Sequence, residues 1–152
     1  SFEDKLERLW RVDVQGTIAT CRAVGERMLT RGNGTIITLG WDQAETGMEG
    51  DAGQMFGATK GAVMAFTKAL AKTLAPAVRV NGVAPGWVRT KWGGDAPAAW
   101  RGRATGEALL RRWGEPADVA AAAVFLASPA ASFITGQIIN VNGGFAGPRP
   151  FE

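Results

Sequence analysis

The sequence predicts an α/β fold with a small parallel sheet of three strands joined by crossover helices. Segments with apolar residues at helical spacing alternate with short segments rich in β-branched residues, in the order helix–strand–helix–strand–helix–strand. The strand segments are apolar on both faces, which is typical of parallel strands buried between two layers of helices. The length of 152 residues fits a single domain.

The first predicted element is a long amphipathic helix over residues 2–30. Gly32 and Gly34 follow it and favour its termination, because glycine adopts the left-handed backbone found at helix C-termini. Residues 35–39 then predict a buried strand, since they are short, β-branched and apolar. The apolar face of the helix recurs in steps of three and four and their multiples, at Leu6, Leu9, Trp10, Val14, Ile18, Val24 and Met28.

The rest of the chain continues the same alternation. Residues 40–53 are rich in glycine and acids and predict a loop. Pro76 ends the next helix, and Pro116 suits the first turn of a later one, where its missing N–H costs nothing. The elements expected in this part are a helix at 54–75, a strand at 78–84, a short helix at 107–113, a helix at 115–127 and a strand at 137–141.

Composition excludes several classes of function. The chain has no His and one Cys, so no Ser-His-Asp or Cys-His catalytic site, no usual zinc site and no internal disulfide is expected. The net charge is +3 with scattered basic residues, which gives little support to nucleic-acid binding. No apolar run is long enough for a membrane span, and no signal segment opens the chain. We therefore expect a cytoplasmic protein that binds no metal, nucleic acid or membrane.

The start of the chain and the edge of the sheet predict a missing neighbour. The chain begins at Ser1 and enters a helical pattern at once, so we expect a fragment or a processed half of a longer protein. The predicted first strand also needs a partner strand that this chain does not contain, because an uncovered apolar edge favours pairing with another chain. A second polypeptide or an assembly is expected to cover it.

Six strings of residues, in this order, resemble the C-terminal half of the classical short-chain dehydrogenase/reductase family. The resemblance covers nearly the whole chain and implies half of a doubly wound, Rossmann-like sheet, in which residues 1–152 are one partial domain. It also implies an NAD(P)-dependent oxidoreductase whose glycine-rich, pyrophosphate-binding half is absent, so that binding of the adenosine end by this chain alone is expected to be poor. The strings are residues 34–39, 56–71, 78–90, 113–120, 125–128 and 135–144.

The catalytic groups that the family uses are largely replaced here. In the family, a Tyr exchanges the proton and a Lys four residues later lowers the pKa of that Tyr and holds the ribose; these positions are Phe56 and Lys60. The family Ser falls on Trp41 when counted from the preceding strand, or on Gln43 when counted back from Phe56. The family Asn of the long helix corresponds to Asp13. Because Phe has no exchangeable proton, the resemblance predicts impaired catalysis.

Three functions remain open on these residues. The first is a pseudoenzyme or a subunit that depends on a partner for catalysis, and the second is a non-catalytic binding or oligomerising module. The third is an active oxidoreductase that uses other groups, such as Lys60 or an acid of the 42–51 loop. Those acids form either a replacement proton relay, a weak cation site or simply a solvated loop: Asp42, Glu45, Glu49 and Asp51.

Other family positions predict cofactor and substrate contacts. The turn after the second strand is expected to lie along the nicotinamide of NAD or NADP, although a Pro-Gly turn after a buried strand also has a purely structural explanation. Lys60 is expected to hold the ribose, unless it is an ordinary solvated lysine. Trp87, Trp92 and Trp100 fall in the substrate-lid region and line either an aromatic pocket or an interface. The turn residues expected at the cofactor are Pro85, Gly86, Trp87, Val88 and Thr90, and Asn142-Gly143-Gly144 is expected as a structural turn.

The family's oligomer-forming elements are all present. In relatives, the helices equivalent to 2–30 and 54–75 pack against copies of themselves, and the last strand and the preceding helix form a second two-fold contact. We therefore expect a homo-oligomer. The apolar stripe expected to supply a self-complementary face of the second helix is Val63, Phe66, Leu70 and Leu74.

Overall fold

A computed structural model describes residues 1–91 and 96–145 of the chain. Its sheet has three parallel strands in the order β1 (Gly34–Leu39), β2 (Val78–Pro85) and β3 (Ile138–Val141). Gly34 lies opposite Val78, and Gly82 lies opposite Ile138. The α/β fold class and the three-stranded parallel sheet are thus confirmed. Within the described part of the chain, no strand pairs with the outer edge of β1.

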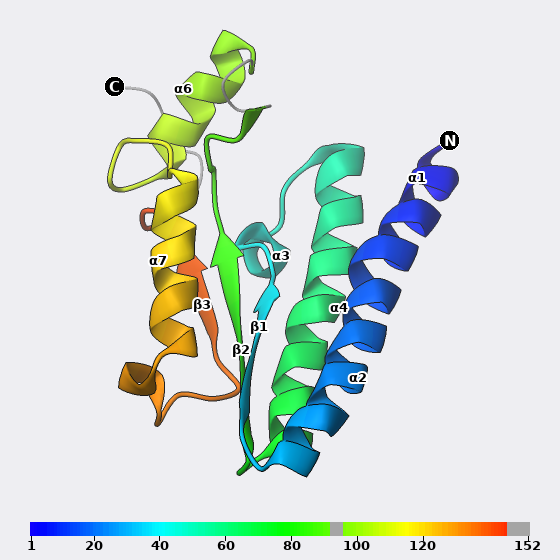
Figure 1. The fold of residues 1–152 in the computed structure, drawn as a ribbon. Helices are drawn as coiled ribbons and strands as arrows, with labels where there is room; N and C mark the ends of the chain where they lie inside the picture. The colour runs from blue at the N-terminus through cyan, green and yellow to red at the C-terminus, as the bar shows by residue number, and fades with distance from the viewer. Residues whose placement is uncertain (92–95, 146–152) are drawn as a thin grey trace.

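Helices cover both faces of this sheet. α2 (Gly16–Arg31) and α4 (Gly50–Leu74) pack on one face, and α7 (Pro116–Ala127) packs on the other (Figure 1). The first core fills the space between the sheet and α2 and α4, around Leu70, Leu74 and Val80. The second lies beneath α7, around Leu126 and Val83. β2 is buried between these two layers, as expected of a parallel strand that is apolar on both faces, whereas the expected burial is incomplete for β1, where Leu39 is exposed, and for β3, which has no fully buried residue.

The predicted first helix is one continuous rod in three parts. Ser1 caps α1 (Phe2–Leu9), a π-helical segment follows at residues 10–15, and α2 ends at Gly32, whose φ is 80°. The π-helical turn was not predicted. Such turns insert a residue into the helical register and occur often at functional sites. This one carries Asp13, whose carboxylate pairs with Lys60 of α4.

The loop predicted at 40–53 is shorter than expected. It contains the helix α3 (Gln43–Thr46), and α4 begins at Gly50, four residues before the predicted start. Gly50 has a φ of 79°, which permits the turn that starts α4. At its other end, α4 stops at Leu74, because Ala75 takes extended backbone before Pro76.

The helix predicted at 107–113 is wrong. The helix in this region is α6 (Ala98–Glu107), and it ends where the prediction began. The backbone N–H groups of Leu109 and Leu110 donate to the carbonyls of Gly144 and Gly143 instead of to the preceding helical turn. The apolar spacing of these leucines was misleading because both side chains are exposed. The helix that starts after Glu115 is confirmed.

Three of the four residues in the apolar stripe predicted on α4 are buried inside the chain itself. Val63, Leu70 and Leu74 are buried inside the monomer, so the prediction that they supply a contact between copies is wrong. An assembly through these helices stays a prediction and now depends on their outward faces, where Trp10 and Val12 are exposed. None of the described helices is both long enough and apolar enough to cross a bilayer.

Candidate functional site

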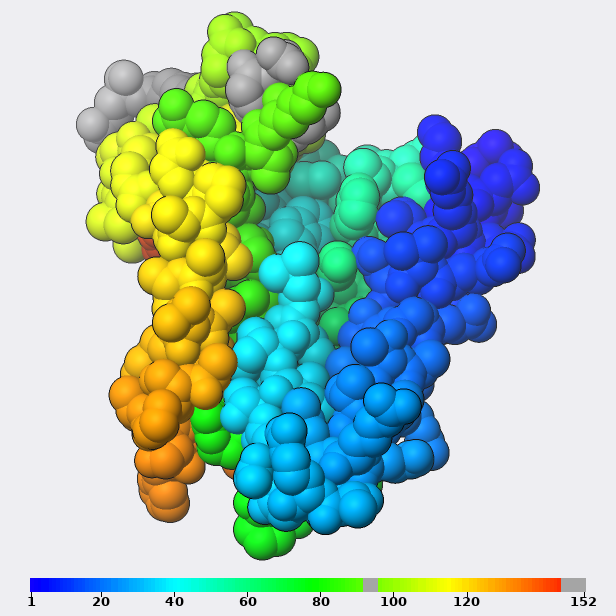
Figure 2. Space-filling view, viewed as in Figure 1, coloured from blue at the N-terminus to red at the C-terminus, as the bar shows by residue number. Residues whose placement is uncertain are grey.

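A large cavity opens at the carboxyl ends of β1 and β2. Its volume is about 1120 Å³. It lies between α7 on one side and α4 with the segment after β1 on the other, and Figure 2 shows the hollow between these two parts. In open α/β sheets, ligands bind outside the carboxyl ends of the strands. The residues of its wall that matter below are Trp41, Met48, Phe56, Lys60, Trp87, Thr90, Trp100 and Trp113.

Phe56 and Lys60 lie one helical turn apart on α4 and both line the cavity. The ring of Phe56 is 40% exposed. The Lys60 ammonium does not stand alone, because its Nζ lies 3.0 Å from Oδ2 of Asp13. Both side chains of the pair are largely shielded from water. The two residues that the resemblance linked to Tyr and Lys are therefore brought together, and Asp13 joins them from the π-helical turn.

The structure separates the two candidates for the family Ser. Trp41 lines the cavity, and its ring meets Phe56 edge-on, with centroids 6.2 Å apart and an angle of 67° between the planes. Gln43 is 1% exposed and is not one of the described residues that line the cavity. In the part of the chain that is described, neither side-chain amide atom of Gln43 has a hydrogen-bond partner. Trp41 is thus the candidate placed beside Phe56.

The turn after β2 forms the floor of the cavity. The residues predicted there, Pro85, Gly86, Trp87, Val88 and Thr90, all line it. Close packing explains one of them without any ligand: a Cβ at position 86 would lie 3.0 Å from Cα of Asn142. The structural interpretation of the Pro-Gly turn therefore accounts for the glycine. Contact of the cofactor with Pro85, Trp87, Val88 and Thr90 stays a proposal.

The acids of the 42–51 segment differ in their surroundings. Asp42 is buried, so the expectation of a solvated loop is wrong for this residue. Its carboxylate accepts hydrogen bonds from Nδ2 of Asn142 at 3.1 Å and from the backbone N–H of Gln43 at 2.8 Å. Burial raises the pKa of Asp42 above its usual value, and these hydrogen bonds offset part of the rise.

The remaining acids are exposed, as a solvated loop requires. Glu45, Glu49 and Asp51 all point to solvent, and none of the four acids lines the cavity. Over residues 1–91 and 96–145, no three potential metal ligands cluster together. Asn142 completes the turn after β3, since its Oδ1 accepts from the N–H of Gly144.

Three tryptophans form the aromatic wall beneath α6. The centroid of Trp87 lies 5.4 Å from that of Trp100 and 6.1 Å from that of Trp113. The prediction of an aromatic pocket is met by Trp87 and Trp100, which line the cavity, whereas Trp92 lies outside the described residues. Trp113 was not predicted as part of this wall.

A buried carboxylate holds this wall in place. Glu107 is 2% exposed and accepts hydrogen bonds from Nε1 of Trp87 and Nε of Arg103, each at 2.7 Å. Arg103 also pairs with Glu49, which precedes α4, and its guanidinium lies over the rings of Trp87 and Trp100. The sequence did not predict this set of contacts of Glu107 with Trp87 and Arg103, which we call the Glu107 clamp. The i,i+4 spacing of Arg103 and Glu107 could have indicated the ion pair, but it is visible only once α6 is placed at 98–107.

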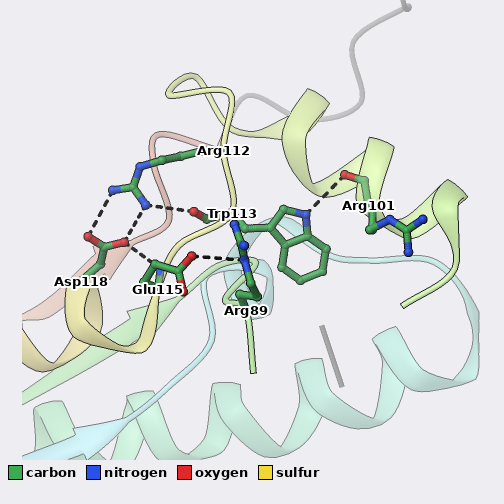
Figure 3. A network of polar contacts seen from close by, with 6 residues as sticks. All are labelled: Arg89, Arg101, Arg112, Trp113, Glu115 and Asp118. Atoms are coloured by element: carbon green, nitrogen blue, oxygen red, sulfur yellow. Dashed lines mark hydrogen bonds and ion pairs between the residues drawn. The ribbon is translucent and has the colours of Figure 1, made fainter. Parts of the chain in front are cut away.

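A second polar network fixes Trp113 to the start of α7. Its indole Nε1 donates to the carbonyl of Arg101 at 3.4 Å, and its own carbonyl accepts from Arg112 at 2.9 Å (Figure 3). Arg112 also binds Asp118, the residue whose carboxylate caps α7 through the N–H of Glu115. The Arg112 guanidinium and this N–H lower the pKa of Asp118 to about 2. The wall of the cavity is therefore tied to α6 and α7 together.

One family model matches almost the whole chain. The family described as enoyl-(acyl carrier protein) reductase matches residues 2–146. Among curated proteins, galactitol 2-dehydrogenase (L-tagatose-forming) of Cereibacter sphaeroides is 40% identical over 150 residues, covering 90% of this chain and 56% of that protein. A 3-oxoacyl-(acyl-carrier-protein) reductase of Thermotoga maritima is 34% identical and covers 93% and 57%. The chain thus spans a little over half the length of these relatives.

Solved structures agree with these matches. A gluconate 5-dehydrogenase from Burkholderia cenocepacia, in complex with NADP and tartrate, has a TM-score of 0.85 and 33% identity, covering 92% of this chain and 55% of that one. A 3-oxoacyl-(acyl-carrier protein) reductase from Brucella melitensis has a TM-score of 0.88 and 31% identity, covering 95% and 54%. The likeness therefore extends from sequence to the three-dimensional arrangement of the elements.

Proposed function

The chain belongs to the short-chain dehydrogenase/reductase family of oxidoreductases, and from this premise we propose that it is a catalytically impaired member. It acts as a pseudoenzyme or as the substrate-side subunit of a partner-dependent enzyme. The observation that carries this proposal is the pair Phe56 and Trp41, which meet on the cavity wall where the resemblance expects Tyr and Ser. A carbonyl held there meets two rings and no hydroxyl from these positions.

Proton transfer is the step that these residues cannot perform. When bound, a nicotinamide dinucleotide supplies or accepts the hydride of the reaction. The oxygen of the substrate must then gain or lose a proton, which requires a group with an exchangeable proton within hydrogen-bond reach. Phe56 has no such proton, and the Trp41 indole N–H donates a hydrogen bond without titrating. These two residues can bind and orient a ligand and exclude water, but they cannot act as acid or base.

The residues present fit the nicotinamide end of NAD or NADP, with one change. Pro85, Trp87, Val88 and Thr90 line the cavity and would face the nicotinamide. Lys60 would face the ribose, but Asp13 already engages its ammonium at 3.0 Å. The glycine-rich turn between a strand and a helix N-terminus, which holds a pyrophosphate, has no counterpart in this sequence. We therefore expect this chain alone to bind the dinucleotide weakly.

Rebuilding the missing hydroxyls tests the proposal. Reduced nicotinamide dinucleotide and a panel of carbonyl compounds are mixed with the wild type, with Phe56→Tyr/Trp41→Ser and with the control Phe56→Leu. At dinucleotide concentrations high enough to offset the weak binding, the wild type and the control should leave the absorbance of the reduced nicotinamide unchanged, whereas the double variant should consume it. Turnover by the wild type that persists in Phe56→Leu contradicts the proposal.

A second candidate function is favoured by the Lys60–Asp13 pair. The Lys60 ammonium lines the cavity, carries exchangeable protons and is backed by the Asp13 carboxylate at 3.0 Å. It is therefore the group best placed to protonate a substrate oxygen if the chain does catalyse reduction. Turnover by the wild type that is lost in Lys60→Met and retained in Phe56→Leu supports this alternative.

A further inference from the structure

We propose that the cavity binds an uncharged, planar, apolar molecule. This inference rests on the proposed function, since it names the class of ligand that the impaired site retains. Two features of the cavity carry it. The cation that lines it, Lys60, and the cation behind its wall, Arg103, are already paired with carboxylates of the chain, and its walls present mainly aromatic rings.

The first compensated cation is Lys60. Of the described residues that line the cavity, it alone carries a formal charge. Its ammonium lies 3.0 Å from the Asp13 carboxylate, in a pair that is mostly shielded from water. A carboxylate or phosphate ligand entering the cavity would lose hydration and would have to compete with Asp13 for this ammonium. An uncharged ligand avoids both costs.

The second compensated cation is Arg103, which lies behind the tryptophan wall. Its Nε donates to Glu107 at 2.7 Å, and its Nη2 donates to Glu49 at 3.1 Å. Its guanidinium is also 5.8 Å from the ring centroid of Trp87 and 5.4 Å from that of Trp100. Two acids therefore compensate the positive charge nearest to this wall, so the Arg103 guanidinium offers little attraction to an anionic ligand in the cavity.

The shape and polarity of the walls favour a flat apolar ligand. Trp41 and Phe56 meet at 67°, so their ring faces form a corner in which a third ring can lie against one face and meet the other edge-on. The hydroxyl of Thr38 is already bonded to that of Thr67 at 2.7 Å, which leaves Thr90 to supply the other hydroxyl of the described wall. A polyhydroxylated ligand would therefore give up water with little return.

A matched pair of fluorescent probes tests the proposal on the full chain. N-phenylnaphthylamine is uncharged, and anilinonaphthalenesulfonate carries the same rings with one added sulfonate. We expect the uncharged probe to bind the wild type at least about tenfold more tightly, a difference of about 1.4 kcal/mol. In Asp13→Asn, which frees the Lys60 ammonium, the sulfonated probe should gain several-fold in affinity while the uncharged probe changes little.

Further variants place the probe in the cavity. Trp41→Ala and Phe56→Ala should each weaken the uncharged probe at least about fivefold, because each removes one face of the corner. Phe133→Ser is the control, since Phe133 is fully exposed and does not line the cavity. Circular dichroism confirms that each variant is folded, and either corner variant suffices if the other fails to fold.

Three results would overturn the inference. They are equal or tighter binding of the sulfonated probe by the wild type, unchanged affinity in a folded corner variant, and a loss in Phe133→Ser that matches the loss in the corner variants. The test is independent of catalysis because no hydride is transferred. Turnover by the wild type would contradict the proposed impairment alone, whereas a failed probe titration would contradict the ligand class alone.

Discussion

Replacing Glu107 by glutamine should destabilise the protein far more than the same change at Glu49. Both carboxylates bind the guanidinium of Arg103, but Glu107 is 2% exposed and the side chain of Glu49 is 76% exposed. Glu107 accepts two hydrogen bonds of 2.7 Å, from Trp87 and from Arg103. A glutamine has one acceptor oxygen, so its amide nitrogen must face one of these donors in a buried place.

The size of the effect follows from that mismatch. A buried donor left without an acceptor costs about 1–3 kcal/mol, and breaking a buried ion pair costs about 3–5 kcal/mol. Because Arg103 keeps Glu49 as a partner, we expect Glu107→Gln to lower the free energy of unfolding by about 3 kcal/mol. Glu49→Gln should leave it almost unchanged, since exposed ion pairs contribute little.

Urea denaturation followed by tryptophan fluorescence measures both variants. With an m-value of about 2 kcal/mol/M, the midpoint for Glu107→Gln should fall by about 1.5 M urea. The fluorescence of the folded state should change as well, because Trp87 loses its partner at Nε1 or Arg103 releases the wall. Equal midpoints for the two variants, or an unchanged midpoint for Glu107→Gln, would refute the view that this carboxylate clamps the wall.

Three further predictions concern stability. Gly53→Ala should lower the free energy of unfolding by about 1–3 kcal/mol, because a Cβ there would meet the backbone carbonyl of Met48. Gly57→Ala in the same helix faces open space and should raise the free energy of unfolding by about 0.5–1 kcal/mol. Thermal melts in which both variants change stability in the same direction would contradict this. Asp118→Asn should destabilise the folded protein near neutral pH. The difference in free energy of unfolding between the variant and the wild type should shrink as the pH falls from above 3.8 toward about 2, because protonation of Asp118, whose pKa is lowered, removes its contribution. A difference that does not change with pH would argue against this role of Asp118. The pH dependence should be opposite for Asp42, because burial raises the pKa of this residue. The wild type should lose stability relative to Asp42→Asn as the pH rises from below 3.8 through the raised pKa. Denaturation curves at several pH values that show the opposite trend would refute this.

Local sequence patterns correctly predicted the helices and strands whose apolar spacing matches the face that they bury. The amphipathic repeat over 2–30 forms helix, and the β-branched segments predicted as strands at 35–39 and 78–84 form β1 and β2, because their apolar side chains pack in the core between helices and sheet. The helix predicted at 107–113 failed for a non-local reason. Residues 109 and 110 give their N–H groups to the turn at 143–144, a contact that no window of neighbouring residues reveals.

The sequence predicted the part of the candidate site that depends on local spacing, and it did not predict the part that depends on the fold. Phe56 and Lys60 are four residues apart on a helix, so their shared position on the cavity wall followed from spacing alone. Counting could not decide between Trp41 and Gln43, because the length of the intervening loop shifts the count; the fold places Trp41 on the wall. The partner of Asp42, Asn142, lies 100 residues away in sequence, and Trp87, which donates to Glu107, lies 20 residues away from it, so neither contact shows in a local pattern.

The central claim is that Phe56 and Trp41, at the positions of the family Tyr and Ser, cannot exchange a proton with a substrate oxygen and that the chain is catalytically impaired as a result. The most direct measurement uses reduced nicotinamide dinucleotide labelled with deuterium at the reactive ring carbon, mixed with the wild-type chain and a panel of ketones and aldehydes. Mass spectrometry of the alcohols then counts every transferred deuteride, however slow the reaction. Our account predicts no more labelled alcohol than in a sample without protein, and labelled alcohol that accumulates beyond one equivalent of the chain would contradict it.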